Sequence, residues 1–153
     1  MHVIRRYNPP VDMKPSRRIF AYLLPALAAS RLPAQESSKR LASKAFPFET
    51  LPVKVNATNT SHPVLDGETH SGFPIEVHVT ELPAGHSPHP PHKHVHEEMF
   101  LIQTGILDAT VNGKKTRLTP GSVCYVNSND EHGVYNPGPE RAEYFVVAFG
   151  AKS

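Results

Sequence analysis

The residues best suited to chemistry lie in one short histidine-rich stretch. Five of the ten histidines of the chain fall between His86 and His96. Alternate side chains of an extended strand share a face. An extended conformation here would therefore gather four side chains that commonly bind metals: His92, His94, His96 and Glu98. Burying imidazoles beside a carboxylate is costly unless something neutralises them. The pattern therefore favours a divalent-metal site, with Glu98 rather than Glu97 as its carboxylate.

Two spacing patterns extend from this stretch. The first reads Gly85, six residues, His92-Lys93-His94, three residues, Glu98, six residues and Gly105. The second reads Gly121, five residues, Asn127-Ser128-Asn129, two residues, His132, three residues and Asn136. In order and internal spacing they resemble the two motifs of the cupin superfamily, in its small single-domain, cupin-2-like form. The first loop is one residue longer, and Asn127 and Asn129 replace Pro and Gly. Because Asn tolerates left-handed backbone, the turn is expected to survive.

The resemblance implies an all-β fold, a single jelly-roll barrel or double-stranded β-helix. It also implies one mononuclear metal centre whose ligands are His92, His94, Glu98 and His132, with coordination positions open to water or substrate. Such ligands suit Fe or Mn, which we favour, and also Ni, Co or Zn. A solvated histidine-rich loop without metal is the alternative. His96 and Tyr135 are candidate catalytic acid–base or supporting groups.

Residues 46–153 are predicted to form the barrel domain. Six short segments rich in β-branched and aromatic residues predict strands: Ile75–Thr80, Met99–Ile102, Leu107–Val111, Thr116–Leu118, Ser122–Val126 and Tyr144–Phe149. Asn112-Gly113 predicts a tight hairpin, because both positions of its turn require positive φ. The four prolines within Pro83–Pro91 predict an irregular loop. Short strands at this spacing are typical of an antiparallel barrel.

Residues 1–34 are interpreted as an export signal. Arg17-Arg18 precede the uncharged stretch Ile19–Ser30, which is too short to span a bilayer but suits the apolar part of a secretory signal. Ser16–Phe20 resembles the twin-arginine export pattern, and translation is expected to start at Met13. An N-terminal helix packed on the domain is the alternative, although Pro25 argues against it. We therefore expect a linker at 35–45 and a periplasmic or secreted protein, with no stable membrane anchor after processing.

Charge and cysteine content exclude several classes. Residues 1–34 carry six Lys/Arg and one Asp, whereas residues 35–153 carry ten Lys/Arg and thirteen Asp/Glu, so the net charges are +5 and −3. The pI near 8.7 therefore reflects the leader, and no nucleic-acid partner is expected. Cys124 is the single cysteine of the chain, which rules out an intrachain disulfide and a multi-cysteine zinc site.

The favoured function is a metal-dependent enzyme, a dioxygenase-like oxidoreductase acting on a small organic substrate. Isomerase, decarboxylase and hydrolase chemistries remain open, because one fold supports many reactions. The alternative from another class is a non-catalytic module that binds a small molecule or metal as a sensor or carrier. Pairing of exposed strands would also allow a homodimer.

Overall fold

The computed structural model describes residues 40–150. The predicted export signal, and the linker up to residue 39, lie outside the described residues. The described chain contains one short 3-10 helix and nine strands: η1 (Phe48–Thr50), β1 (Lys54–Val55), β2 (Thr60–Glu68), β3 (Pro74–Leu82), β4 (Glu97–Thr104), β5 (Leu107–Val111), β6 (Lys114–Leu118), β7 (Val123–Val126), β8 (His132–Tyr135) and β9 (Ala142–Phe149). Within these residues, no helix has the length and apolar character needed to cross a membrane.

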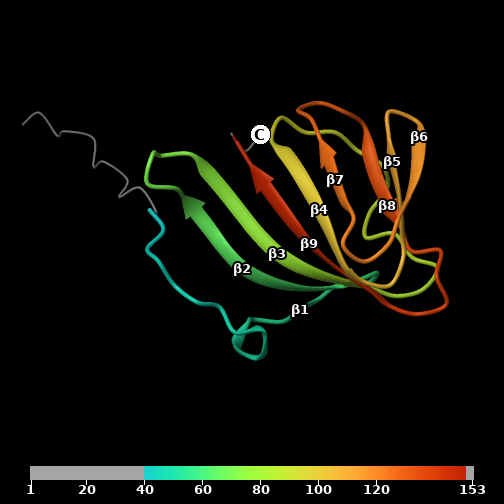
Figure 1. Cartoon of the computed structure of the whole chain (residues 1–153), viewed down its shortest axis with the longest axis horizontal. Coiled ribbons are helices and arrows are strands. Elements are labelled where there is room, and N and C mark those ends of the chain that lie inside the picture. The colour runs from blue at the N-terminus through green and yellow to red at the C-terminus, as the bar shows by residue number, and fades with distance from the viewer. Residues whose placement is uncertain (1–39, 151–153) are drawn as a thin grey trace, which may run out of the picture. The chain divides into compact units, whose positions relative to one another are not determined.

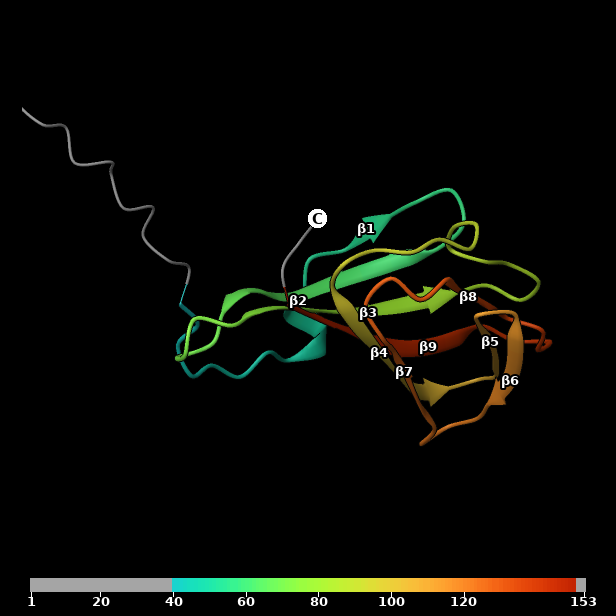
Figure 2. The same ribbon diagram turned by 90° about the horizontal axis from the view of Figure 1, so that it is seen from above.

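The strands form two antiparallel sheets. The larger sheet has the order β1-β2-β3-β9-β4-β7, and the smaller has the order β6-β5-β8. In both views the smaller sheet lies toward one end of the larger one (Figures 1 and 2). The larger sheet joins strands from both ends of the described chain, since β3 and β4 pair with β9 on either side. This arrangement confirms the predicted all-β jelly roll of the cupin type.

The six predicted strand segments are all present, in β3, β4, β5, β6, β7 and β9. The Asn112-Gly113 hairpin is confirmed, because φ is 48° at Asn112 and 78° at Gly113 and β5 pairs with β6 directly around them. Asn129 has a φ of 63°, so asparagine does supply the left-handed position of the second motif. Sequence reasoning missed β1, β2 and β8.

The barrel core follows from alternation along β4 and β9. Phe100, Ile102, Tyr144 and Val146 are all buried, whereas the residues between them are only partly buried. The turn after β4 approaches β9 so closely that a Cβ on Gly105 would lie 2.7 Å from the Cα of Ala142. A side chain is therefore excluded at Gly105, whose φ of 74° also favours glycine.

The predicted extended strand over 92–98 is wrong for its first half, because β4 begins only at Glu97. β9 ends at Phe149, opposite Glu97, so 92–96 has no strand of the larger sheet beside it. Instead, His92 and His132 form an isolated antiparallel bridge with N···O distances of 3.0 and 2.8 Å. The backbone N–H of Asn129 also donates to the carbonyl of His94 at 2.8 Å. These contacts fix an irregular segment in one position.

Candidate metal centre

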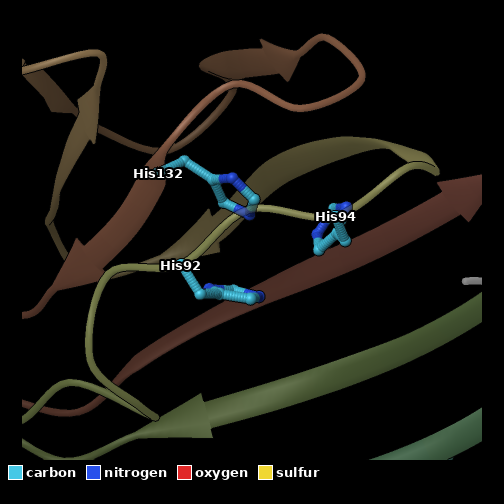
Figure 3. A group of neighbouring side chains, drawn as sticks. All are labelled: His92, His94 and His132. Carbon is cyan, nitrogen blue, oxygen red and sulfur yellow. The ribbon is translucent and has the colours of Figure 1, made fainter.

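The four predicted ligands come from three places in the fold and meet at one point. His92 and His94 lie in the loop before β4, Glu98 is on β4, and His132 begins β8. Figure 3 shows the three imidazoles pointing into a shared space. The ring centroids of His92 and His94 both lie 4.7 Å from that of His132. The ligating atoms of the three histidines lie within 4.8 Å of one another.

The carboxylate of Glu98 completes this group. Its Oε2 lies 3.3 Å from Nε2 of His132, and its Oε1 lies 3.5 Å from Nε2 of His94. Glu98 therefore adjoins two of the three histidines, and we call His92, His94, Glu98 and His132 the histidine–glutamate cluster.

Backbone carbonyls fix the tautomers of two rings in the cluster. Nδ1 of His94 lies 2.7 Å from the carbonyl oxygen of His96, and Nδ1 of His132 lies 2.9 Å from that of Asp130. A carbonyl only accepts, so Nδ1 is the donor and Nε2 carries the lone pair of the neutral ring. Both Nε2 atoms therefore present lone pairs toward the Glu98 oxygens, an arrangement that repels unless a proton or a cation lies between them.

Burial makes this arrangement costly without a cation. Nε2 of His94, Nε2 of His132 and Nδ1 of His92 are buried and have no hydrogen-bond partner in the described structure. Unsatisfied buried nitrogen atoms are rare in folded proteins and call for an explanation. Nitrogen lone pairs converging beside a carboxylate are a donor set that suits a divalent transition metal. The residues present therefore fit the predicted ion.

The pKa shifts in the cluster follow from the same geometry. Burial opposes ionisation of Glu98, but the neighbouring His132 and His94 outweigh it and lower the pKa of the carboxyl to about 2. Burial likewise opposes protonation of His132, but the Glu98 carboxylate raises the pKa of this ring above its usual range, so without a metal a proton on Nε2 takes the place of the cation beside Glu98. Burial, followed by the neighbouring imidazoles, lowers the pKa of His92. Glu98 thus stays ionised at neutral pH, which favours a bound cation.

His96 adjoins the cluster in a different way. Its ring stacks on that of His94 at 3.5 Å with 7° between the planes, and its Nε2 lies 3.4 Å from Oε1 of Glu98. Imidazole lone pairs lie in the ring plane, so two parallel stacked rings cannot direct them at one ion. His94, His96 and Glu98 do form a second group within ligating distance. The stacking nevertheless favours His96 as a donor that orients Glu98.

The structure does not bring Tyr135 to the cluster. His132 and Val134 of β8 are buried, whereas Tyr135 is 42% exposed. Alternation along the strand turns Tyr135 to the opposite face, where it lines a shallow cleft with Asp108 and Lys115. The predicted acid–base role of Tyr135 therefore has no support in this geometry.

Other residues beside the cluster were not predicted. His89 lies edge-on to His92 with 4.2 Å between ring centroids. A cavity of about 340 Å³ adjoins Glu98 and His132 and is also lined by His78, Thr80 and Tyr144. Alternation within the predicted strand 75–80 places His78 and Thr80 on one face, but nothing local indicates that this face meets the histidines.

Comparison with protein families agrees with this geometry. Residues 78–148 match the family model described as the cupin domain. This stretch is similar in sequence to a cupin domain. It contains the whole histidine–glutamate cluster together with His96, and it includes the second half of β3, all of the strands from β4 to β8, and β9 except for its last residue.

Solved structures show the same cupin fold at low sequence identity. An RmlC-like cupin from Shewanella frigidimarina is 19% identical with a TM-score of 0.59, covering 71% of this chain and 93% of its own. A predicted oxalate decarboxylase from Thermotoga maritima is 19% identical with a TM-score of 0.59, covering 71% and 100%. The polyketide cyclase RemF from Streptomyces resistomycificus is 16% identical with a TM-score of 0.61, covering 72% and 82%. None of the curated proteins matches this sequence.

Proposed function

We propose that this cupin domain binds one divalent metal ion through the histidine–glutamate cluster and acts as a metal-dependent enzyme on a small organic substrate. One observation carries the proposal: the Nε2 lone pairs of His94 and His132, fixed by backbone carbonyls, face the Glu98 carboxylate in a buried site. A bound ion would supply Lewis-acid or redox chemistry to a substrate lying beside it. A dioxygenase-like oxidation is the specific reaction we favour.

The donor set guides the choice of metal. Three imidazoles and one carboxylate are suitable for Fe and Mn, which we propose, and Ni, Co and Zn also accept such ligands. The four side chains leave further coordination positions for substrate or water. The single carboxylate, Glu98, would offset one of the two positive charges of the ion.

The residues of the chain itself have separate tasks in this proposal. His94 and His132 are held in their ligating tautomer by the carbonyls of His96 and Asp130. His96 holds Oε1 of Glu98 by donating from Nε2, which leaves Oε2 directed at His132. Tyr144 is buried beside the cavity, and burial raises the pKa of its phenol, so it remains a neutral hydrogen-bonding group.

A non-catalytic binding module is the second candidate. The observation that favours it is the position of Tyr135, because the predicted proton-transfer group faces away from the cavity. Such a module would bind the ion and a small molecule without turnover. Export of the chain and formation of a homodimer are separate proposals. Recovery of the chain from the cytoplasm alone would contradict export, and a monomer in sedimentation would contradict the dimer.

The decisive experiment is elemental analysis of the full chain, produced without an affinity His-tag, beside the double variant His92→Ala/His132→Ala. His70→Ala is the matched control, since His70 is an exposed turn residue away from the cavity. We expect close to one Fe or Mn per chain in the parent and the control, and none in the double variant. A folded parent that takes up no divalent ion, even after reconstitution, would overturn the metal site.

Activity then separates the two candidates. We would follow O₂ consumption by the loaded protein with small phenols, diketones and organic acids. Turnover that is lost in the double variant supports the enzyme. Ligand binding without turnover across this panel supports the sensor or carrier.

A further inference from the structure

The cavity beside the histidine–glutamate cluster has two unlike walls. Glu98 and His132 form one side, and Phe100 and Val146 add apolar surface. A polar wall comes from the β1–β2 turn, β2, β3 and β9: Asn56, Asn59, Ser61, His78, Thr80 and Tyr144. A ligand at the cluster would therefore face hydrogen-bonding groups on its far side.

The pairing of β3 with β9 fixes the position of this polar wall. His78 and Thr80 are two residues apart on β3, so they share a face. His78 pairs with Val146 and Thr80 with Tyr144 on β9. Thr80 and Tyr144 are 2% and 1% exposed, and their side chains are hydrogen-bonded to each other. The wall is thus a rigid part of the sheet rather than a mobile loop.

The polar wall carries no fixed charge. Among the described residues that line the cavity, Glu98 is the one carboxylate, and no lysine or arginine is present. Burial is the main cause that lowers the pKa of His78, so its ring is neutral at pH 7 and can both donate and accept. Oε1 of Glu76 lies 3.8 Å from Nδ1 of His78 and raises the pKa of this ring, whereas Lys54 lowers it. Lys54 is exposed and lines a different groove.

Charge and size together limit the ligand. A divalent ion and Glu98 leave one net positive charge at the cluster, which one negative charge on a ligand would neutralise. A second negative charge beside the buried Thr80 and Tyr144 would meet neutral groups and no cation, and an unpaired charge in such a place is costly. A cavity of about 340 Å³ is also at the small end of ligand pockets.

We propose that the cavity takes a small, oxygen-rich compound with at most one negative charge, whose distal oxygen is hydrogen-bonded by His78. Phosphorylated compounds and dicarboxylates are excluded. The proposal rests on the proposed function, because the metal would bind the two proximal oxygens. His78 is a specificity-determining residue in this scheme, and the Thr80–Tyr144 pair shapes the wall beside it.

The test uses the full chain loaded with Co(II), whose visible spectrum reports ligands entering its coordination sphere. Three probes are compared. Kojic acid is a neutral hydroxyketone chelator and oxalate is a dianionic chelator. Azide binds to the metal alone and makes no use of the polar wall. We expect kojic acid to bind more tightly than oxalate once each is scaled to its affinity for free Co(II). His78→Leu should weaken kojic acid about tenfold, as expected for one lost hydrogen bond, and leave azide binding unchanged.

Two further variants keep the test independent of misfolding. His78→Gln retains a donor and an acceptor and should restore most of the kojic acid affinity, whereas His70→Leu should change nothing. The inference would be overturned if the parent preferred oxalate to kojic acid, or if the parent and His78→Leu bound kojic acid equally tightly. Azide binding by the same samples would show that the metal site itself is intact. Failure to bind both Co(II) and azide would instead overturn the proposed function itself.

Discussion

His132 and Asn136 belong to the same sequence motif, and both are buried, yet their surroundings are opposite. The side chain of Asn136 donates to the carbonyls of Leu82 and Glu140, each at 2.8 Å, and accepts from the backbone N–H of Gly138 at 2.9 Å. Nε2 of His132 has no hydrogen-bond partner among the described residues and faces a carboxylate. Four residues along one chain thus separate a fully satisfied polar group from an unsatisfied one.

This difference distinguishes buried polar groups that stabilise the fold from buried polar groups that are available to a ligand. A buried polar group whose partners all belong to the protein stabilises the fold and leaves nothing for a ligand. A buried group left without a partner costs stability, so its retention indicates something that binds there. Asn136 therefore belongs to the first kind, since it ties the β8–β9 turn to the end of β3, and His132 to the second.

The largest expected effect is on metal affinity. His132→Leu fills similar space without a ligating nitrogen, so it should weaken metal binding about a thousandfold, as expected for losing one of four ligands. The metal-free variant should lose about 2 kcal/mol of stability, because the Asp130 carbonyl and the Glu98 carboxylate each lose the ring beside them. Chelator competition and urea unfolding measure the two quantities. If His132→Leu strongly destabilised the fold but kept its metal affinity, His132 would be a structural group like Asn136.

Asn136→Ala should show the reverse pattern. The substitution leaves two carbonyls and one N–H without their partner in a buried site, so the free energy of unfolding should fall by about 3 kcal/mol. Metal affinity of the protein that remains folded should be close to that of the parent. Urea unfolding and chelator competition on the same sample check both statements, and a loss confined to metal binding would contradict them.

His96 is expected to have an intermediate effect. His96→Phe keeps a ring stacked on His94 but removes the donor near Oε1 of Glu98. Metal affinity should fall by about tenfold, which is typical when a group that orients a ligand is removed. His96→Gln should recover part of this loss in chelator competition. If His96→Phe weakened metal binding as much as His132→Leu does, His96 would be a metal ligand rather than a group that orients Glu98.

The smallest effect concerns the Asp108–Arg117 pair on the outer face. Nε of Arg117 donates to Asp108 at 2.9 Å, and this bond holds the pKa of the carboxyl below its usual range. The stabilisation is therefore present above the unfolded pKa of Asp and lost as pH falls through the lower folded value. Arg117→Gln should slightly lower the urea midpoint at about pH 6 and match the parent at about pH 2. A pH-independent difference would refute this explanation.

Local patterns predicted the strands that alternate, and motif spacing selected the four residues of the histidine–glutamate cluster. β2 was missed because Pro63 and Gly67 interrupt its pattern, although pairing with β1 and β3 holds it extended. The prediction of an extended strand over 92–96 was wrong because the conformation of this segment depends on where β9 ends. No local sequence pattern reveals that position. The polar wall around His78 also required the register between β3 and β9. Tyr135 was misjudged because β8 was not recognised, and a strand there puts residues 132 and 135 on opposite faces.

The bridge between His92 and His132 also bears on when metal selection takes place. The two residues lie far apart in the sequence, and no short segment of the chain contains all four side chains of the histidine–glutamate cluster. Such long-range contacts form late, because closing a long loop costs entropy that later contacts must offset. The histidine–glutamate cluster is therefore complete only once the barrel has closed. For the metal binding proposed above, the compartment in which the chain folds would then decide which ions compete for the cluster.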